Sequence, residues 1–280
     1  EILCWDRSCL YESEVLDGIT LTRFHIPSVP GSGFKQLPAF RRFIAACKEK
    51  LENESFDYLH CHDFDGILIG RKIKRKNAKL IFDMHELYDS GRLQKFAPLV
   101  RRMVTRCQND CDHVIYLYEE QKTYMTEENK KKLVFLPNYP SEESFSTAKT
   151  PSEKLRVAYI GYIRRYDLMK NLFDACAGMD DVQVLIHGSG MDFDRLKALA
   201  EGYPNVEMTG RFDGRQIRGL YENADVQYVV YDVGNKNWKT VFPVKLFESI
   251  ITATPVIAAK DSFTGDFTER NGMGLCVTWD

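Results

Sequence analysis

The sequence predicts an α/β fold in which two Rossmann-like units follow one another along the chain. Short apolar runs alternate with segments whose apolar residues recur every three or four positions, which is typical of a parallel, doubly wound sheet. The alternation is interrupted once, near the middle of the 280 residues. Polar or glycine-rich clusters follow most of the expected strands, at the edge where such sheets bind ligands.

Six strands are expected in the first half of the chain, each a short run rich in β-branched, aromatic or other apolar residues. They are Ile2–Trp5, Ile19–His25, Tyr58–His60, Lys79–Phe82, His113–Leu117 and Leu133–Leu136. Segments with a helical period lie between several of them, for example Phe40–Glu52 and Pro98–Cys107.

Six more strands are expected in the second half: Arg156–Ile160, Gln183–His187, Val206–Thr209, Val226–Val230, Val256–Ala259 and Gly274–Val277. Phe193–Glu201 is one of the helical segments between them. The two halves are separated by PNYPSEESFSTAKTPSE, residues 137–153, which is rich in Pro, Ser and Glu. We therefore expect domains at 1–138 and 154–280, a linker at 139–153, and a cleft that the domains face. Because the chain starts and stops on strand-like runs, we also expect both ends to be cut relative to a complete fold.

Composition narrows the functional classes. The formal net charge is −2, which argues against a nucleic acid partner. The eight cysteines lack the paired spacing of a structural metal site and are expected to be free thiols in a reducing cytoplasm. No run is long enough to span a membrane.

Two clusters in the first half follow neighbouring strands and resemble the ligand set of a metallohydrolase. They are His60, His62 and Asp63, and then Asp83, His85 and Glu86. Nothing in the sequence sets the spacing between the two clusters, so a metal is not favoured. We expect His60 to cap a helix or satisfy a loop, and His85 to be functional, because imidazole exchanges a proton near neutral pH.

A cationic cluster follows the first strand of the second half. Gly161 allows close approach of the backbone to a ligand, and Arg164, Arg165 and Lys170 come after it. Such a trio is either a solvated face or a clamp for a diphosphate. The loop HGSG, with Gly188 and Gly190, follows the next strand and is a weak signal by itself.

The segment FPVKLFESI, residues 242–250, predicts a helix that begins at Pro243. Leu246, Phe247, Ile250 and Ile251 would form its apolar face. Lys245 and Glu248 would lie on another face, either as a solvated ion pair contributing about 0–1 kcal/mol or as ligand-binding groups. In the second interpretation the helix start and Lys245 attract an anion, and Glu248 holds two vicinal hydroxyls such as those of a ribose.

In this order, the motifs resemble the GT-B glycosyltransferases of the large retaining family 4. They are ILCWDR, FDYLHCHDFDG, LIFDMHELY, VIYLYEEQ, LPNYP, RVAYIGYIRRYDLMKNL, LIHGSG, VEMTGRF, LYENADVQYVVY and FPVKLFESIITATPVIA. The resemblance covers essentially the whole chain. It implies transfer of a sugar from a nucleotide-diphosphate sugar, UDP- or GDP-linked, to a glycan or lipid-linked acceptor, with retention and without a metal or other cofactor.

The resemblance also implies roles for individual residues. Arg165 or Arg164, with Lys170, would neutralise the leaving diphosphate, and Pro243, Val244 and Lys245 would bring helix-start amides to it. Glu248 would hold the ribose, and His85 would lie beside the transferred sugar. The other site residues implied are Gly161, Gly188, Gly190 and Arg211 around the donor, and His62, Asp63 and Glu86 on the acceptor side.

Two departures from the family pattern keep other functions open. Thr240 stands where the family often has a first glutamate eight positions before Glu248, and the spacing from arginine to lysine is looser than usual. A sugar-nucleotide epimerase and a non-catalytic nucleotide-sugar-binding module are therefore alternatives. Basic stretches at 71–79 and 92–107 are either solvated helix faces or sites of peripheral contact with an anionic membrane.

Overall fold

The computed structural model describes residues 1–29 and 32–279, without the side chains of Phe34 and of residues 91–93. The chain forms two compact units. Unit 1 comprises Glu1–Glu86, Pro98–Tyr116 and Tyr124–Val134, and unit 2 comprises Leu87–Ala97, Leu117–Thr123 and the chain from Phe135 onward. All twelve predicted strands are present, each within two residues of its expected bounds.

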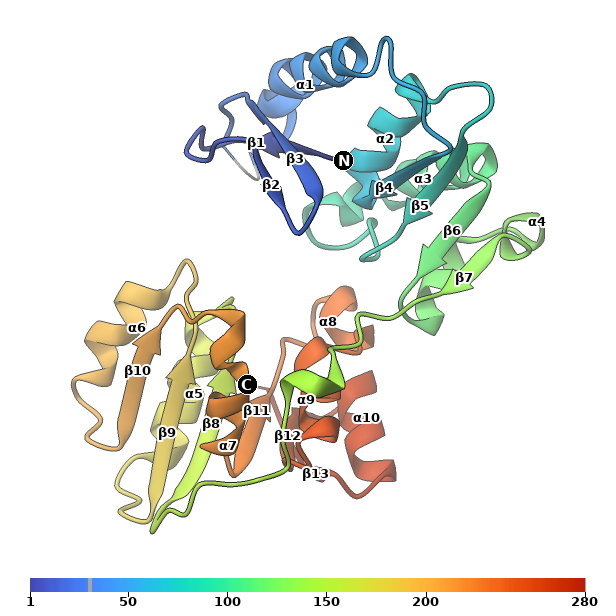
Figure 1. Ribbon diagram of the computed structural model, residues 1–280. Coiled ribbons are helices and arrows are strands. Elements are labelled where there is room, and N and C mark those ends of the chain that lie inside the picture. Colours follow the sequence, from blue (N-terminus) through green and yellow to red (C-terminus); the bar gives the residue numbers. More distant parts are fainter. Residues whose placement is uncertain (30–31, 280) are drawn as a thin grey trace. The chain divides into compact units, whose positions relative to one another are not determined.

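Unit 1 contains a three-stranded and a four-stranded sheet. The smaller has the order β1-β3-β2, with β1 at Ile2–Asp6, β2 at Glu14–Leu16 and β3 at Ile19–His25. The larger has the order β4-β5-β6-β7, with β4 at Tyr58–His62, β5 at Lys79–Asp83, β6 at His113–Tyr116 and β7 at Leu133–Phe135. The helices of unit 1 are α1 (Leu37–Lys50), α2 (Asp63–Ile73), α3 (Ala97–Asp110) and the short α4 (Glu127–Lys130) (Figure 1).

Strand β2 was not predicted from the sequence. It pairs antiparallel with β3 through the turn Asp17-Gly18, in which both residues have positive φ angles (50° and 78°). An Asp-Gly pair between two apolar runs is a strong hairpin signal, so the information was present in the sequence.

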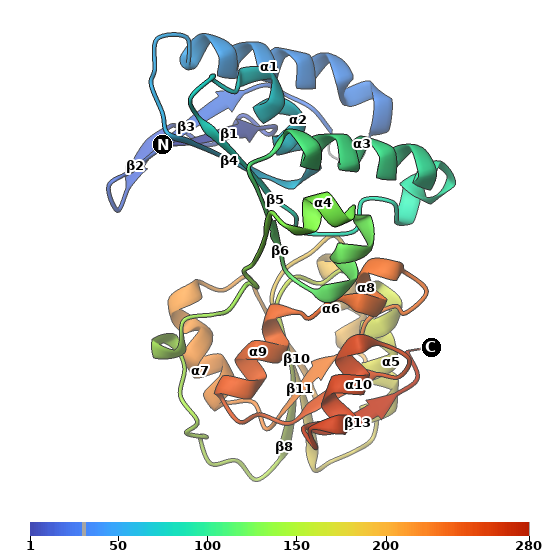
Figure 2. The same cartoon turned by 90° about the vertical axis from the view of Figure 1, so that its right-hand side faces the viewer.

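Unit 2 is a six-stranded parallel sheet with the order β10-β9-β8-β11-β12-β13. Its strands are β8 (Leu155–Ile160), β9 (Val182–His187), β10 (Val206–Gly210), β11 (Val226–Val229), β12 (Val256–Ala259) and β13 (Gly274–Val277). Counted within the unit, this order is 3-2-1-4-5-6, that of a doubly wound nucleotide-binding fold. The helices α5 (Tyr166–Cys176), α6 (Phe193–Ala200), α7 (Ile217–Glu222), α8 (Lys236–Thr240), α9 (Val244–Ile251) and α10 (Phe263–Arg270) connect the strands (Figure 2).

Strand β8 shows why this sheet is buried on both faces. Val157 and Tyr159 pack with α5 and α6, whereas Ala158 and Ile160 pack with Tyr221 of α7 on the opposite face. Alternate residues of a strand point to opposite faces, so a continuous apolar run is needed when helices cover both.

The segment predicted as a linker is part of unit 2 and packs against its sheet and helices. Phe145 is buried in a cluster with Tyr221, and the Lys149 ammonium donates to the Thr254 hydroxyl at 2.6 Å. Thr150 N donates to the carbonyl of Glu222 at 2.8 Å. This part of the chain is thus ordered by contacts with the sheet that follows it.

Candidate functional site

The polar groups predicted after the strands of unit 2 lie at the carboxyl edge of its sheet, where the strand order reverses. β8 and β11 are neighbours in the sheet although two strands separate them in the sequence. Connections that leave two such strands diverge and open a crevice, which is the usual ligand site of doubly wound folds. A pocket of about 140 Å³ is found there, lined among others by Tyr159, Arg164, Arg165, Tyr231, Asp232 and Trp238.

Lys245, in the first turn of α9, has a buried ammonium group that finds no hydrogen-bond acceptor among the described residues. The residue is 8% exposed, and its Nζ lies 3.6 Å from the ring centroid of Tyr159 and 5.7 Å from that of Tyr231. Burial lowers the pKa of Lys245 from 10.5 to about 7; nearby Glu248 opposes this shift and Arg164 adds to it. A buried cation that contacts ring faces but makes no hydrogen bond within the described chain is a costly arrangement unless an anion is bound.

Glu248 lies one turn further along α9 and is 9% exposed. Its Oε2 accepts a hydrogen bond of 2.8 Å from the Tyr221 hydroxyl. Burial raises the pKa of Glu248, although the Tyr221 hydrogen bond and the charge of Lys245 act against it.

The interpretation of Lys245 and Glu248 as a solvated ion pair is therefore wrong. Both side chains are buried, and no hydrogen bond or ion pair joins them among the described residues. The predicted apolar face of α9 is also partly wrong, since Ile250 is 44% exposed. The helix turns its two charged residues inward because the carboxyl edge of the sheet, rather than solvent, lies beside them.

Arg164 is held by aromatic rings. Its Cζ lies 4.7 Å from the ring centroid of Trp238 and 5.4 Å from that of Tyr162. Among the described residues its guanidinium has no ion pair. Stacking holds the flat group in place while its N–H donors remain available for a ligand.

Arg165 and Lys170, by contrast, are already paired with carboxylates. Arg165 contacts Asp167, and its Nη1 lies 2.6 Å from Asp232 Oδ2. Lys170 contacts Asp174, one helical turn away in α5. A diphosphate would have to compete with these partners, so their assignment to the leaving group stays a prediction.

The glycines at this edge are required by packing. A Cβ on Gly188, whose φ is 145°, would lie 1.8 Å from the carbonyl oxygen of Gly161, and one on Gly190 would lie 1.9 Å from that of Ile163. At Gly161 a Cβ would instead meet Lys245 Nζ at 3.5 Å. Two loops thus approach closely and leave the Lys245 ammonium beside Gly161.

The remaining predicted donor residues lie around this region of unit 2. Pro243 is the N-cap of α9 and Val244 its first residue. Arg211 directly follows β10 and is exposed. Sequence reasoning missed Tyr159, Tyr221, Tyr231 and Trp238, which surround the charged groups. Only their positions could have indicated them: Tyr159 lies near the end of β8, Tyr231 just after the end of β11, and Tyr221 in α7, the helix before β11.

In unit 1, the two predicted polar clusters meet on one face of the larger sheet. His60 Nε2 lies 3.0 Å and His62 Nδ1 3.3 Å from Asp83 Oδ2, while His62 Nδ1 lies 3.1 Å from His85 Nε2. His60 therefore contacts a strand-end carboxylate, and the expectation that it caps a helix or satisfies a loop is wrong. The N-cap of α2 is His62, which makes no side-chain cap bond.

This cluster shifts the pKa values of its members. The Asp83 carboxylate raises the pKa of His85 against the effect of burial. Burial and the neighbouring His60 lower the pKa of His62. Asp63, the first residue of α2, and the exposed Glu86 lie next to the cluster in the chain and add negative charge near His85.

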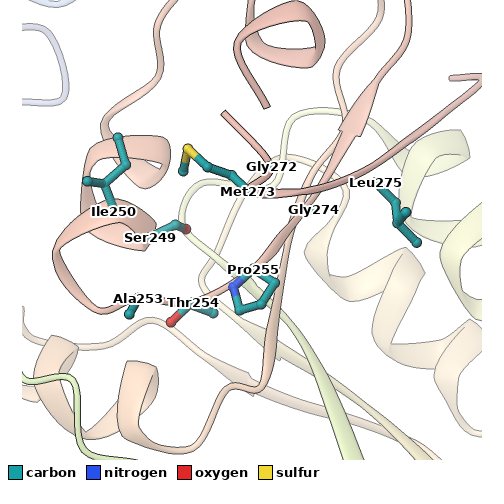
Figure 3. A pocket seen from close by; sticks show the side chains of 9 residues that line it. All are labelled: Ser249, Ile250, Ala253, Thr254, Pro255, Gly272, Met273, Gly274 and Leu275. Atoms are coloured by element: carbon teal, nitrogen blue, oxygen red, sulfur yellow. The ribbon is translucent and has the colours of Figure 1, made fainter. Parts of the chain in front are cut away.

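A second cavity in unit 2, of about 540 Å³, is not part of this site. It lies at the amino ends of β12 and β13 and is lined by Ser249, Ile250, Ala253, Thr254, Pro255, Gly272, Met273, Gly274 and Leu275 (Figure 3). It contains no charged side chain, and it is at the opposite edge of the sheet from the one where doubly wound folds bind ligands.

The comparison with solved structures finds several of similar fold. Sucrose-phosphate synthase from Thermosynechococcus elongatus matches with a TM-score of 0.75 and 17% identity, over 99% of this chain and 75% of that one. HepE from Anabaena in complex with UDP and glucose matches with a TM-score of 0.64 and 14% identity, over 93% of this chain and 73% of that one. A TarM variant from S. aureus in complex with fondaparinux, α-GlcNAc-glycerol and UDP matches with a TM-score of 0.60 and 18% identity, over 84% of this chain and 49% of that one. The comparison with curated proteins gives no match.

Family models account for nearly all of the chain. Residues 2–139 match Glycosyltransferase Family 4, and residues 140–278 match Glycosyl transferases group 1. Together with two Rossmann-like units and a parallel sheet whose order reverses beside the buried Lys245, these matches confirm the resemblance seen in the sequence. The chain belongs to the group 1 glycosyltransferases of family 4, with the GT-B fold.

Proposed function

We propose that the protein transfers a hexose from a nucleotide-diphosphate sugar to a glycan or lipid-linked acceptor, with retention of anomeric configuration and without a metal cofactor. Sugar transfer itself follows from family membership. The donor, the acceptor, the retention and the roles of individual residues are the proposal.

The observation that carries the proposal is the buried ammonium of Lys245 at the switch point of the sheet. An anionic diphosphate beside Nζ would supply the acceptor that the group lacks and would favour its charged form. The helix-start amides of Val244 and Lys245 and the dipole of α9 favour the same anion. Arg164, stacked on Trp238, is the second cation available for it.

Glu248 is the group proposed to hold the ribose. One of its oxygens accepts from Tyr221, which orients the carboxylate, and the other makes no hydrogen bond within the described residues. A carboxylate oriented in this way can accept from two vicinal hydroxyls. Because Glu248 is buried, its carboxylate lost hydrogen bonds to water on folding. Ligand hydroxyls would restore those hydrogen bonds.

His85 is proposed to act beside the transferred sugar, and His62, Asp63 and Glu86 on the acceptor side. His85 would stabilise the positive charge that develops on the sugar, through its neighbourhood, which includes the Asp83 carboxylate, or through its backbone. Arg165 and Lys170 are candidates to neutralise the diphosphate once they exchange their carboxylate partners.

UDP is the first donor to test, because HepE and TarM were both solved with UDP, and GDP is the alternative. The assay is a thermal-shift titration with UDP, GDP and their sugar conjugates in EDTA. A ligand at 100 times its Kd should stabilise the protein by about 2.7 kcal/mol. Glu248→Gln should lose this stabilisation, whereas the exposed Glu201→Gln should keep it.

The second step separates the possible functions. Release of nucleotide that depends on an acceptor, with the anomeric configuration of the product retained by NMR, supports the proposal. Conversion of the donor sugar without an acceptor would indicate an epimerase. Tight binding without turnover would indicate a binding module, and activity lost in EDTA would contradict metal independence.

Peripheral contact with an anionic membrane accompanies the proposal for a lipid-linked acceptor. No helix among the described residues has the length and apolar character needed to cross a bilayer. In α3, Val100 and Val104 are buried and Leu99 is exposed. Within 71–79, Arg71 pairs with Asp110, and Lys74 and Lys79 pair with Asp112, which reduces the charge available to lipid. Flotation with phosphatidylserine vesicles tests this contact, and recovery of all protein in the unbound fraction would exclude it.

A further inference from the structure

Three histidines and one aspartate of unit 1 converge although the sequence separates them into two pairs. His60 and His62 are two residues apart in β4 and so point to the same face of the sheet. The parallel register places Asp83 of β5 beside His62. His85 follows two residues after Asp83 and reaches back, with its Nε2 3.6 Å from Asp83 Oδ1. The register of β4 against β5 therefore brings these side chains together, which the sequence alone did not predict.

The spacing of three ligand atoms fits a metal ion. Nitrogen and oxygen ligands at the corners of a zinc site, each about 2.0–2.2 Å from the ion, lie roughly 3.3–3.5 Å from one another. Here Asp83 Oδ2 lies 3.0 Å from His60 Nε2 and 3.3 Å from His62 Nδ1. One ligand atom each from His60, His62 and Asp83 lies within 4.8 Å of the other two.

The Asp83 carboxylate points independently to a missing cation. Asp83 is 7% exposed, and its buried Oδ1 has no hydrogen-bond partner in the part of the chain that the structure describes. His85 Nε2, at 3.6 Å from this oxygen, is beyond hydrogen-bond length. A buried carboxylate oxygen with no donor is destabilising, and a metal ion in contact with it would remove that cost.

His62 and His85 contact each other within the cluster. Their nitrogens Nδ1 and Nε2 lie 3.1 Å apart, so one neutral ring can donate a hydrogen bond to the other. A metal ion bound at His62 Nδ1 would replace this hydrogen bond. Asp63 and Glu86 contribute further negative charge close to His85.

We propose that His60, His62 and Asp83 form a binding site for a divalent first-row transition metal ion, with Zn²⁺ as the best-fitting species and His85 beside it. Two imidazoles and one carboxylate are ligands that suit zinc rather than magnesium or calcium, and water would take the fourth position. None of these residues is among those proposed to bind the nucleotide in unit 2, and sugar transfer is proposed to proceed without the metal. If His85 acts in transfer as proposed above, bound metal would inhibit the enzyme; this consequence alone depends on the proposed function.

The test is titration of the full, tag-free chain with ZnCl₂ by isothermal calorimetry in a non-chelating buffer. One equivalent is expected to bind, and EDTA should reverse it. His60→Asn and Asp83→Asn should each weaken binding by more than about tenfold, since loss of even an outer-shell partner has an effect of about that size. His113→Asn, an exposed histidine of unit 1 outside the cluster, is the matched control and should bind like the wild type.

Cobalt provides a readout that does not depend on activity. Co²⁺ in place of Zn²⁺ should give the intense visible bands of a tetrahedral site in wild type and His113→Asn but not in His60→Asn. Because His60 is partly exposed, this variant should fold even if the buried Asp83→Asn does not. Absence of a saturable equivalent in the wild type, or equal affinity in wild type and His60→Asn, would overturn the proposal and leave a hydrogen-bonded histidine cluster.

Discussion

Replacing Lys245 by methionine should stabilise the ligand-free protein and remove its affinity for nucleotide. Methionine has nearly the length of lysine and would keep the contact with the Tyr159 ring, but it introduces no charge. The free energy of unfolding should therefore rise, which is the opposite of what most substitutions of a buried residue do. Binding should fall because the cation proposed to face the diphosphate is gone.

The size of the stabilisation follows from the pKa. An unfolded lysine holds its proton up to a pH near 10.5, whereas folded Lys245 holds it only up to about 7. Folding is therefore penalised by about 4 kcal/mol at pH 7, and the penalty fades as the pH rises toward 10.5. The stability difference between Lys245→Met and wild type should shrink from about 5 kcal/mol at pH 6 to about 2 kcal/mol at pH 9. These values are upper bounds, because the ring contacts favour the ammonium.

Urea unfolding of both proteins between pH 6 and pH 9 measures the difference, and a thermal shift with UDP measures binding. Lys197→Met, an exposed lysine of α6, is the control and should change neither quantity. A Lys245→Met protein less stable than wild type at every pH would refute the burial argument. Unchanged stabilisation by UDP would refute the role of the ammonium in nucleotide binding.

Three further predictions concern stability. Arg156→Ala should destabilise unit 2 by about 3 kcal/mol in urea, because its buried guanidinium pairs with Asp225 at 2.8 Å and the carboxylate would lose its partner; a loss below about 1 kcal/mol would contradict this. Gly188→Ala should fold poorly by circular dichroism because of its positive φ and the clash with the opposing loop, whereas Gly219→Ala, with open space at its Cβ, should be as stable as wild type or slightly more so. The pKa of Asp112 is lowered mainly by a backbone hydrogen bond, so its carboxylate stabilises the folded state above its ordinary pKa of 3.8, and this stabilisation is lost as the pH falls. Asp112→Asn should therefore lower the free energy of unfolding more at pH 6 than at pH 3. Equal losses at both pH values would exclude this linkage.

The fold was predictable because its pattern is local. A strand buried on both faces must be apolar along its length, and a helix on a sheet must be apolar every three or four residues, so each element leaves its own signature. The order of the motifs then identified the family. The short strand β2 was missed because three residues carry too little pattern, although the Asp17-Gly18 turn marked it.

The candidate sites were predictable only in part, because their chemistry depends on neighbours distant in the sequence. The sequence alone identified Lys245 and Glu248 as the charged residues of an otherwise apolar helix, but a helix does not state which face meets the sheet. Burial next to Tyr159 and Tyr221, from other elements, turned a possible surface pair into a desolvated cation and an oriented carboxylate.

The same reason applies to Arg165 and to the histidines. Asp232, from a distant part of unit 2, pairs with Arg165 and distinguishes it from the neighbouring Arg164. The register of β4 against β5 places Asp83 beside His62 and so assembles a cluster whose halves are more than twenty residues apart. The sequence by itself determined which chemical groups are present and the edge of the sheet at which they lie. Tertiary structure alone decided their distances and desolvation, because Coulomb forces and hydrogen bonds depend on separation in space and on the surrounding dielectric.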